Sequence, residues 1–158
     1  MTCSELEDYL VEVDGVVKDA FLVGSVLNPK MQSYIAQFLS VYISGSMEEG
    51  LRILLIEFAK PGSPDEIHKF TKHNVEGFTT PFANNIKQLL NKFSSDWGSE
   101  FSTRIEHSQK ASLDSLVVNK NNIAHGRQSL ITLVDVEKFY KDCQKIIELI
   151  DDIVFKVV

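Results

Sequence analysis

Residues 113–127 have the sequence LDSLVVNKNNIAHGR, and we expect the functional residues of the chain in this segment. Its first part has the spacing of an amphipathic helix, in which four apolar side chains can share one buried face: Leu113, Leu116, Val117 and Ala124. Its last part is polar and closes at Gly126. The segment therefore predicts a helix whose C-terminal end carries polar side chains that could take part in catalysis or binding.

The polar end of this predicted helix holds Lys120, Asn121, Asn122 and His125. Asn121 and His125 are four residues apart and are neighbours on a helix surface. Lys120 precedes His125 by five residues, which separates the two by about 140° around an ideal helix. One chain therefore does not point Lys120 and His125 in the same direction. Either the last turn is distorted, or a second chain completes the site.

The stretch from Lys120 to Gly126 resembles the signature of the HEPN superfamily of all-helical proteins. In that signature an Arg and a polar residue precede a His, often as Arg-Asn-x-Ile-Ala-His-Gly. The resemblance covers five positions and departs at Lys120, where the superfamily has Arg: Asn121, Ile123, Ala124, His125 and Gly126. A long upstream helix bearing Ser46-Met47-Glu48-Glu49 and a downstream helix opening at Thr132 are similar to the RiboL-PSP type of HEPN domain, over roughly residues 30–158.

The resemblance implies metal-independent RNA cleavage. The ribose 2′-OH would attack the adjacent phosphorus, leaving a 2′,3′-cyclic phosphate and a 5′-OH, while a cationic residue stabilises the developing charge. The resemblance also implies a two-fold homodimer with two facing motifs. Each site could then take Lys120 and His125 from different chains.

The residue types suit this chemistry. His125 lies near a helix C-terminus, where the helix dipole favours the imidazolium, and a histidine can move a proton in phosphoryl transfer. Lys120 can neutralise a phosphate as a point charge, and Asn121 can hold the imidazole or a phosphate oxygen. We therefore expect His125, Lys120 and Asn121 to be catalytic. Asn122 and Arg127 are candidates for RNA binding.

Glu49 is a further catalytic candidate. Residues 30–60 are predicted to form one long helix with a single stripe that contains Glu49: Ile35, Leu39, Tyr42, Ser46, Glu49, Ile53 and Ile56. A carboxylate on an apolar face must be paired, hydrogen-bonded, protonated or next to a cavity. The alternative is that Gly45 and Gly50 bend the helix, so that Glu49 turns outward and Glu48 is the buried carboxylate.

The remaining sequence predicts helices alone. A first helix spans residues 4–27, with a possible capping box of Ser4 and Glu7. A turn at residues 60–64 precedes a short helix that starts at Ser63 or Pro64, and residues 82–93 and 99–111 form others around a loop at 94–99. Thr132 and Asp135 can cap the last helix, which carries a long apolar stripe: Val136, Tyr140, Cys143, Ile147, Ile150, Val154 and Val157. We predict one all-α domain over residues 1–158, with an N-terminal helix (1–28) and a HEPN-like core (30–158). The fold is a bundle of four principal helices with a short helical insertion at 61–100.

Composition narrows the class of protein. A length of 158 residues suits one domain, and a net charge of −6 argues against general nucleic-acid binding. Residues 60–127 nevertheless hold nine basic and seven acidic side chains, against three and nine in residues 1–59. This distribution permits a local phosphate site, although ordinary variation in surface charge is an equal explanation. Two distant cysteines, no signal peptide and no membrane span predict a cytoplasmic protein without a disulfide framework.

No cofactor or metal is expected. His68 and His73 are five residues apart and do not share a helix face, and no phosphate loop or serine elbow is present. The first hypothesis is an endoribonuclease that acts on RNA as a homodimer, used as a toxin or in phage defence, with a possible cognate antitoxin. The second is a catalytically degenerate HEPN module, marked by Lys120, that binds RNA or a partner protein. The third is a purely helical interaction protein.

Overall fold

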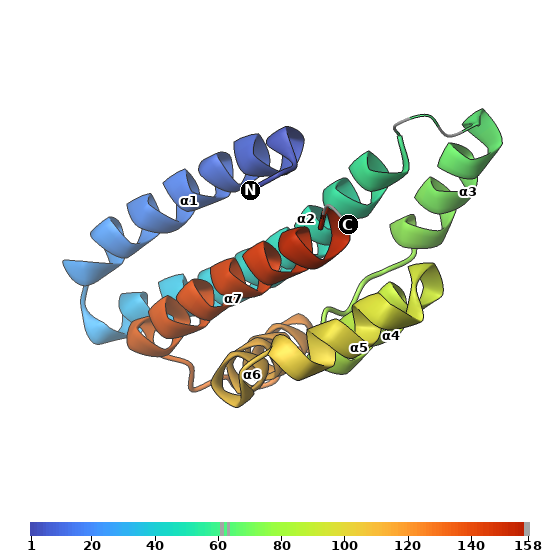
Figure 1. Cartoon of the computed structure of the whole chain (residues 1–158). Coiled ribbons are helices and arrows are strands. Elements are labelled where there is room, and N and C mark those ends of the chain that lie inside the picture. The colour runs from blue at the N-terminus through green and yellow to red at the C-terminus, as the bar shows by residue number, and fades with distance from the viewer. Residues whose placement is uncertain (61, 63, 157–158) are drawn as a thin grey trace.

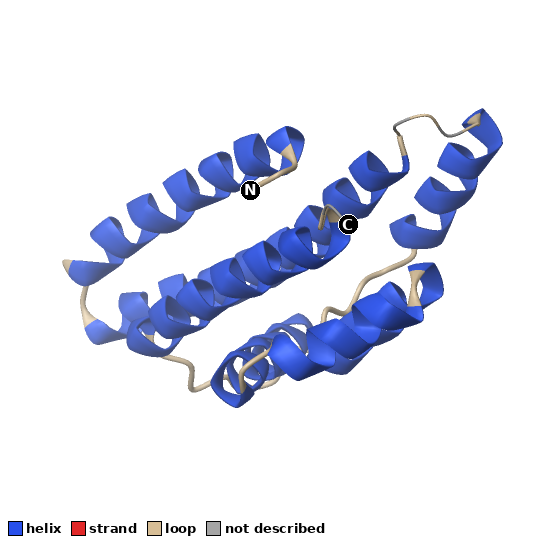
Figure 2. Ribbon diagram, viewed as in Figure 1, coloured by secondary structure: helices blue, strands red, loops and turns tan. Residues whose placement is uncertain are grey.

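The computed structural model describes residues 1–60, 62 and 64–156. These residues form seven helices and no strand (Figure 2). The four principal helices are α1 (Ser4–Ser25), α2 (Pro29–Ala59), α6 (His107–Ala124) and α7 (Leu133–Val154). The insertion consists of α3 (Asp65–Glu76), α4 (Ala83–Phe93) and α5 (Ser95–Arg104), and it extends slightly beyond the predicted residue 100. The predicted all-α bundle of four principal helices with a short helical insertion is confirmed. Ser63 and Val157, which the sequence placed at a helix start and in the last apolar stripe, lie outside the described residues.

Helix α2 is the central element of the bundle. It packs against α1, α3, α6 and α7, and Figure 1 shows α7 running alongside it. Because neighbours cover several of its sides, its buried residues extend about halfway around the helix: Ala36, Leu39, Ser40, Ile43, Ser44, Met47, Glu48, Leu51, Leu54 and Leu55. Tyr42, Ile53 and Ile56 of the predicted stripe are only partly buried. The stripe marks one border of the buried face, and the centre of that face is displaced around the helix.

One hydrophobic core receives side chains from all seven helices. From α1 it takes Leu6, Val13 and Val17, so the N-terminal helix shares the core of the other elements. The predicted stripe of α7 is largely buried, with Tyr140 at its partly buried edge. The Thr132 hydroxyl and the Asp135 carboxylate form the predicted capping box of this helix.

The predicted loop at residues 94–99 is wrong, because α5 begins at Ser95. The Ser94 hydroxyl accepts a hydrogen bond from the backbone N–H of Asp96 at 3.3 Å, which caps the new helix. Helix α5 can then fold back closely on α4. A Cβ atom at Gly98 would lie 3.0 Å from the backbone carbonyl oxygen of Lys87 and would displace the Asn91 side chain, so the close approach favours glycine at this position.

The predicted capping box of Ser4 and Glu7 does not form. Cys3 is the N-cap residue of α1, and its side chain makes no capping hydrogen bond. The carboxylate of Asp151 in α7 replaces the local cap. It accepts hydrogen bonds from the backbone N–H groups of Thr2 at 2.8 Å and Cys3 at 3.2 Å. A carboxylate at a helix N-terminus is also favoured by the helix dipole.

Replacing Asp151 by alanine is expected to lower the free energy of unfolding by about 2 kcal/mol, because two backbone N–H groups lose a charged acceptor. Urea denaturation would measure the change. Asp152→Ala is the matched control, since its side chain is 60% exposed and its ion pair with Arg104 should contribute about 0.5 kcal/mol. If both variants lose the same free energy of unfolding, the hydrogen bonds between Asp151 and the start of α1 contribute no more than an exposed ion pair.

Cys3 and Cys143 are both free and buried, as expected for a chain without a disulfide framework. Burial raises the pKa of both thiols, that of Cys143 most strongly. A thiol with a raised pKa holds little reactive thiolate, so neither cysteine is suited to nucleophilic chemistry. In the part of the chain that the structure describes, no helix has the length and apolar character needed to cross a membrane.

Candidate functional site

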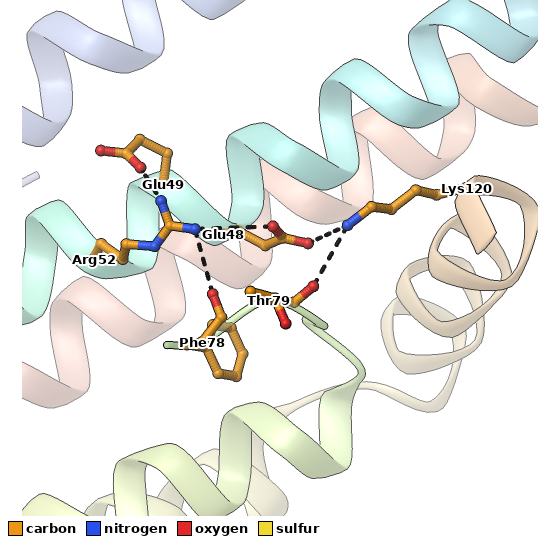
Figure 3. Close-up of polar contacts among 6 residues, drawn as sticks. All are labelled: Glu48, Glu49, Arg52, Phe78, Thr79 and Lys120. Carbon is orange, nitrogen blue, oxygen red and sulfur yellow. Dashed lines mark hydrogen bonds and ion pairs between the residues drawn. The ribbon is translucent and has the colours of Figure 1, made fainter. Parts of the chain in front are cut away.

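The carboxylate of Glu48 is the centre of a polar cluster that joins α2, α6 and the linker between α3 and α4 (Figure 3). Glu48 is buried, with 10% of its side chain exposed. Its Oε1 accepts a hydrogen bond from Lys120 Nζ, and its Oε2 lies 4.0 Å from Arg52 Nη2. Glu49 forms an ion pair with Arg52 on the outer side. Two cations and two carboxylates therefore balance each other in this cluster.

The same two cations hold the linker of residues 77–82. Arg52 Nη2 donates to the carbonyl oxygen of Phe78 at 3.3 Å, and Lys120 Nζ approaches the carbonyl oxygen of Thr79 at 3.5 Å (Figure 3). The ammonium group of Lys120 is thus fixed between a buried carboxylate and a backbone carbonyl. Its side chain remains 21% exposed, so the protein does not enclose it fully.

Glu48, and not Glu49, is the buried carboxylate of α2. The side chain of Glu49 is 43% exposed. The sequence left both possibilities open, and the structure shows the second. Helix α2 continues through Gly45 and Gly50, so an interruption of the helix is not the cause. Glu48 is enclosed because α6 and the 77–82 linker bring contacts to its side of α2.

Helix α6 ends as the sequence predicted. Gly126 has a φ of 66°, its N–H donates to the Ile123 carbonyl at 3.0 Å, and the Arg127 N–H donates to the Asn122 carbonyl at 2.8 Å. These bonds form a Schellman cap, in which glycine supplies the left-handed backbone. The expectation that Ala124 shares the buried face is wrong: Leu113, Leu116 and Val117 are buried, but Ala124 is exposed because no element covers the last turn.

Lys120 and His125 diverge within one chain. Lys120 makes its polar contacts with Glu48 and Thr79 on the inner side of α6. His125 is the C-cap residue, with an exposed side chain and a backbone N–H that donates to the Asn121 carbonyl at 3.1 Å. Helix α6 is regular as far as Ala124, so no distortion of its last turn brings the two side chains together.

The other predicted residues surround this helix end. Asn121 and Asn122 are partly buried, and Arg127 is exposed. Ser129 Oγ donates a hydrogen bond to Asn119 Oδ1 at 2.7 Å, which ties the following loop back to α6, and no local pattern predicts this contact. Arg52 was not among the predicted site residues, although an acid and a base four residues apart on one helix are a recognisable pair.

Metal ligands are not gathered anywhere in the described ranges. The described residues contain no group of three or more His, Cys, Asp or Glu side chains that could hold a metal ion.

The helical bundle and the helix end at His125 and Gly126 define a HEPN-type module. The family model of RiboL-PSP-HEPN matches residues 2–156, so the chain belongs to the RiboL-PSP-HEPN family. The match includes α1, which lies outside the 30–158 range of the resemblance seen in the sequence. No curated protein and no solved structure is significantly similar to the chain.

Proposed function

We propose that this protein is a metal-independent endoribonuclease. The placement of Lys120 carries the proposal: its ammonium group is fixed by Glu48 at a point that solvent can reach, on the helix that ends in His125. A cation held in advance at this point can stabilise the charge that develops on a phosphate without first reorganising. Membership of the RiboL-PSP-HEPN family supports the same assignment.

In the proposed reaction the ribose 2′-oxygen forms a bond to the adjacent phosphorus, and the bond from phosphorus to the 5′-oxygen breaks. The 2′-OH loses its proton and the departing 5′-oxygen gains one; His125 transfers one of these protons and water exchanges the other, while Lys120 stabilises the phosphate charge. Asn121 orients the imidazole or a phosphate oxygen. Glu49, predicted as a catalytic residue, enters the proposal through its ion pair with Arg52. Asn122 and Arg127 flank the helix end and would contact the RNA backbone.

We also propose a homodimer that builds each site from two chains. Lys120 and His125 diverge in one chain, so a two-fold partner can supply the missing group. An exposed apolar stripe on α2 supports a docking face near the cluster: Tyr34, Phe38 and Val41 recur at intervals of four and three residues, and Val118 of α6 is also exposed. Continued along α2, the same helical spacing passes Gly45 and the buried Glu48, so the exposed stripe ends about two helical turns before the cluster.

The purified protein should cleave single-stranded RNA in the presence of EDTA and leave 2′,3′-cyclic phosphate and 5′-OH ends. An all-DNA strand should stay intact because it lacks the 2′-OH, and a DNA strand with one ribonucleotide should be cut only there. End-group analysis of the fragments measures this outcome. Loss of cleavage in EDTA with recovery on adding a divalent ion, or fragments with 3′-OH ends, would contradict the mechanism.

A catalytically degenerate module that binds RNA or a partner protein is the second candidate. The observation in its favour is Lys120 itself, which offers one hydrated charge where the superfamily signature has the two-pronged guanidinium of Arg. A wild-type protein that binds RNA but does not cut it would support this candidate.

A role as a toxin or defence effector, restrained by a cognate antitoxin, adds a separate expectation. Expression in bacteria should then arrest growth, and the His125→Ala variant should not.

A further inference from the structure

A polar cleft lies beside the cluster, between the end of α3, the 77–82 linker and α4. Its volume is about 520 Å³, within the range of about 300–1,000 Å³ that holds small ligands. The lining consists of nine residues: Asn74, Gly77, Phe78, Thr79, Thr80, Asn85, Gln88, Leu89 and Lys92. None of these residues belongs to the cluster around Glu48 by its side chain, so the cleft is a separate feature.

The cleft and the cluster share one wall. Phe78 and Thr79 line the cleft, and their backbone carbonyls contact Arg52 and Lys120. Figure 3 shows both carbonyls directed toward the two cations. A single stretch of backbone therefore separates a ligand in the cleft from Lys120. A chain that crosses this wall can occupy both places at once.

The shared wall is held in position at its far end too. Asp114 Oδ1 of α6 accepts a hydrogen bond from the backbone N–H of Ala83 at 2.9 Å. Asn85 Nδ2 donates to the carbonyl of Thr80 at 2.9 Å. With the two cations at the other end, these bonds fix the linker before any ligand arrives. A cleft formed in advance does not have to be ordered on binding.

The lining chemistry matches a nucleobase. Amide side chains and threonine hydroxyls offer both hydrogen-bond donors and acceptors, as the edges of unpaired bases do. Gln88 and Lys92 are exposed, and neither side chain has a hydrogen bond or ion pair to any described residue. Lys92 is the one charged residue among the nine that line the cleft. Its ammonium group could form an ion pair with a phosphate beside the base.

We propose that the cleft binds one unpaired nucleobase of the RNA, next to the phosphate that is cut. Gln88 bonds to the edge of the base, Lys92 contacts the flanking phosphate, and the strand crosses Thr79 to reach Lys120. The inference rests on the proposed ribonuclease function and adds its place of sequence selection. Sequence-specific recognition of single-stranded RNA depends on such contacts with splayed bases.

Binding can be measured apart from cleavage in a His125→Ala background, by fluorescence anisotropy with a labelled single-stranded oligoribonucleotide. Gln88→Ala and Lys92→Ala should each weaken binding by about tenfold. The slope of log K against the logarithm of salt concentration should become shallower by about one for Lys92→Ala, which corresponds to one lost phosphate contact. The slope should not change for Gln88→Ala. Asn84→Ala and Lys87→Ala are matched controls on α4 outside the cleft and should bind like the parent protein.

The outcomes separate this inference from the proposed function. If the wild type cuts RNA but the cleft variants bind like the controls in the His125→Ala background, the cleft inference is overturned and the ribonuclease stands. If the wild type never cuts RNA and the cleft variants still lose binding, the cleft inference stands and the ribonuclease does not. If no RNA binds to the His125→Ala parent at micromolar concentration, the cleft inference is overturned, and the ribonuclease is overturned as well if the wild type does not cut RNA.

Discussion

Replacing Lys120 or His125 by alanine is expected to cut the rate of RNA cleavage by roughly 100-fold or more. Loss of one group that stabilises the transition state typically has an effect of this size. Lys120→Arg should keep or raise the activity, because the charge is unchanged and a guanidinium can grip two phosphate oxygens. Initial rates on a labelled RNA, at one protein concentration for all variants, measure these effects.

The stability of the same variants separates chemistry from folding. The side chain of His125 is exposed, so His125→Ala should melt like the wild type. Lys120→Ala leaves Glu48 without its hydrogen-bonded partner and should have a lower melting temperature. Lys120→Arg can retain the pair and should melt close to the wild type. A Lys120→Ala rate measured well below its melting temperature therefore reports the missing cation.

Mixing the two inactive variants tests the shared site. If each site takes Lys120 from one chain and His125 from the other, a heterodimer of Lys120→Ala with His125→Ala keeps one intact site. Random exchange of subunits should then restore about a quarter of the wild-type rate. Sites built within single chains would give no recovery.

If every variant cleaves like the wild type, the motif is structural. An inactive wild type that Lys120→Arg activates would identify the degenerate module.

Glu48→Ala is expected to lower the free energy of unfolding by about 3 kcal/mol, because it leaves Lys120 and Arg52 without the carboxylate that lies between them. This value is at the lower end for a broken buried ion pair, since both cations are partly exposed. RNA cleavage should fall with it, roughly 100-fold, because Lys120 is no longer fixed. Urea denaturation and the cleavage assay measure the two effects.

Glu49→Ala is the matched control on the neighbouring residue. Its carboxylate is 43% exposed and pairs with Arg52 alone, so its removal should cost about 0.5 kcal/mol. A double-mutant cycle of Glu48→Gln with Lys120→Met measures the coupling between the two side chains directly. A larger loss for Glu49→Ala than for Glu48→Ala, in stability or in cleavage, would reverse the assignment of the two glutamates.

Local patterns allowed most of the helices to be predicted. The stripe of α7, its Thr132 cap and the glycine at the end of α6 depend on contacts within a few residues, which a sequence displays directly. The divergence of Lys120 and His125 followed from helix geometry alone. The buried side of α2 was harder to place, because neighbours on several sides determine which stripe is central.

Contacts between distant parts of the chain could not be predicted. Glu48 and Lys120 are separated by 72 positions, and only the packing of α2 against α6 brings them together. The carbonyls of Phe78 and Thr79 carry no sequence information at all, since any residue presents the same backbone atom. The cluster and its adjoining cleft are therefore products of the fold.

The carboxylate that caps α1 has a consequence for the order of synthesis. Thr2 and Asp151 are 149 positions apart, and a ribosome adds about 5–20 residues per second. About 7–30 seconds therefore pass between translation of the first turn of α1 and arrival of its cap. During that interval α1 can already pack against α2, but the N-terminal N–H groups of Thr2 and Cys3 lack the carboxylate that later accepts their hydrogen bonds. The segment containing Lys120 and His125 is translated before Asp151, so a nascent chain carries the end of α6 before the N-terminus of α1 is capped.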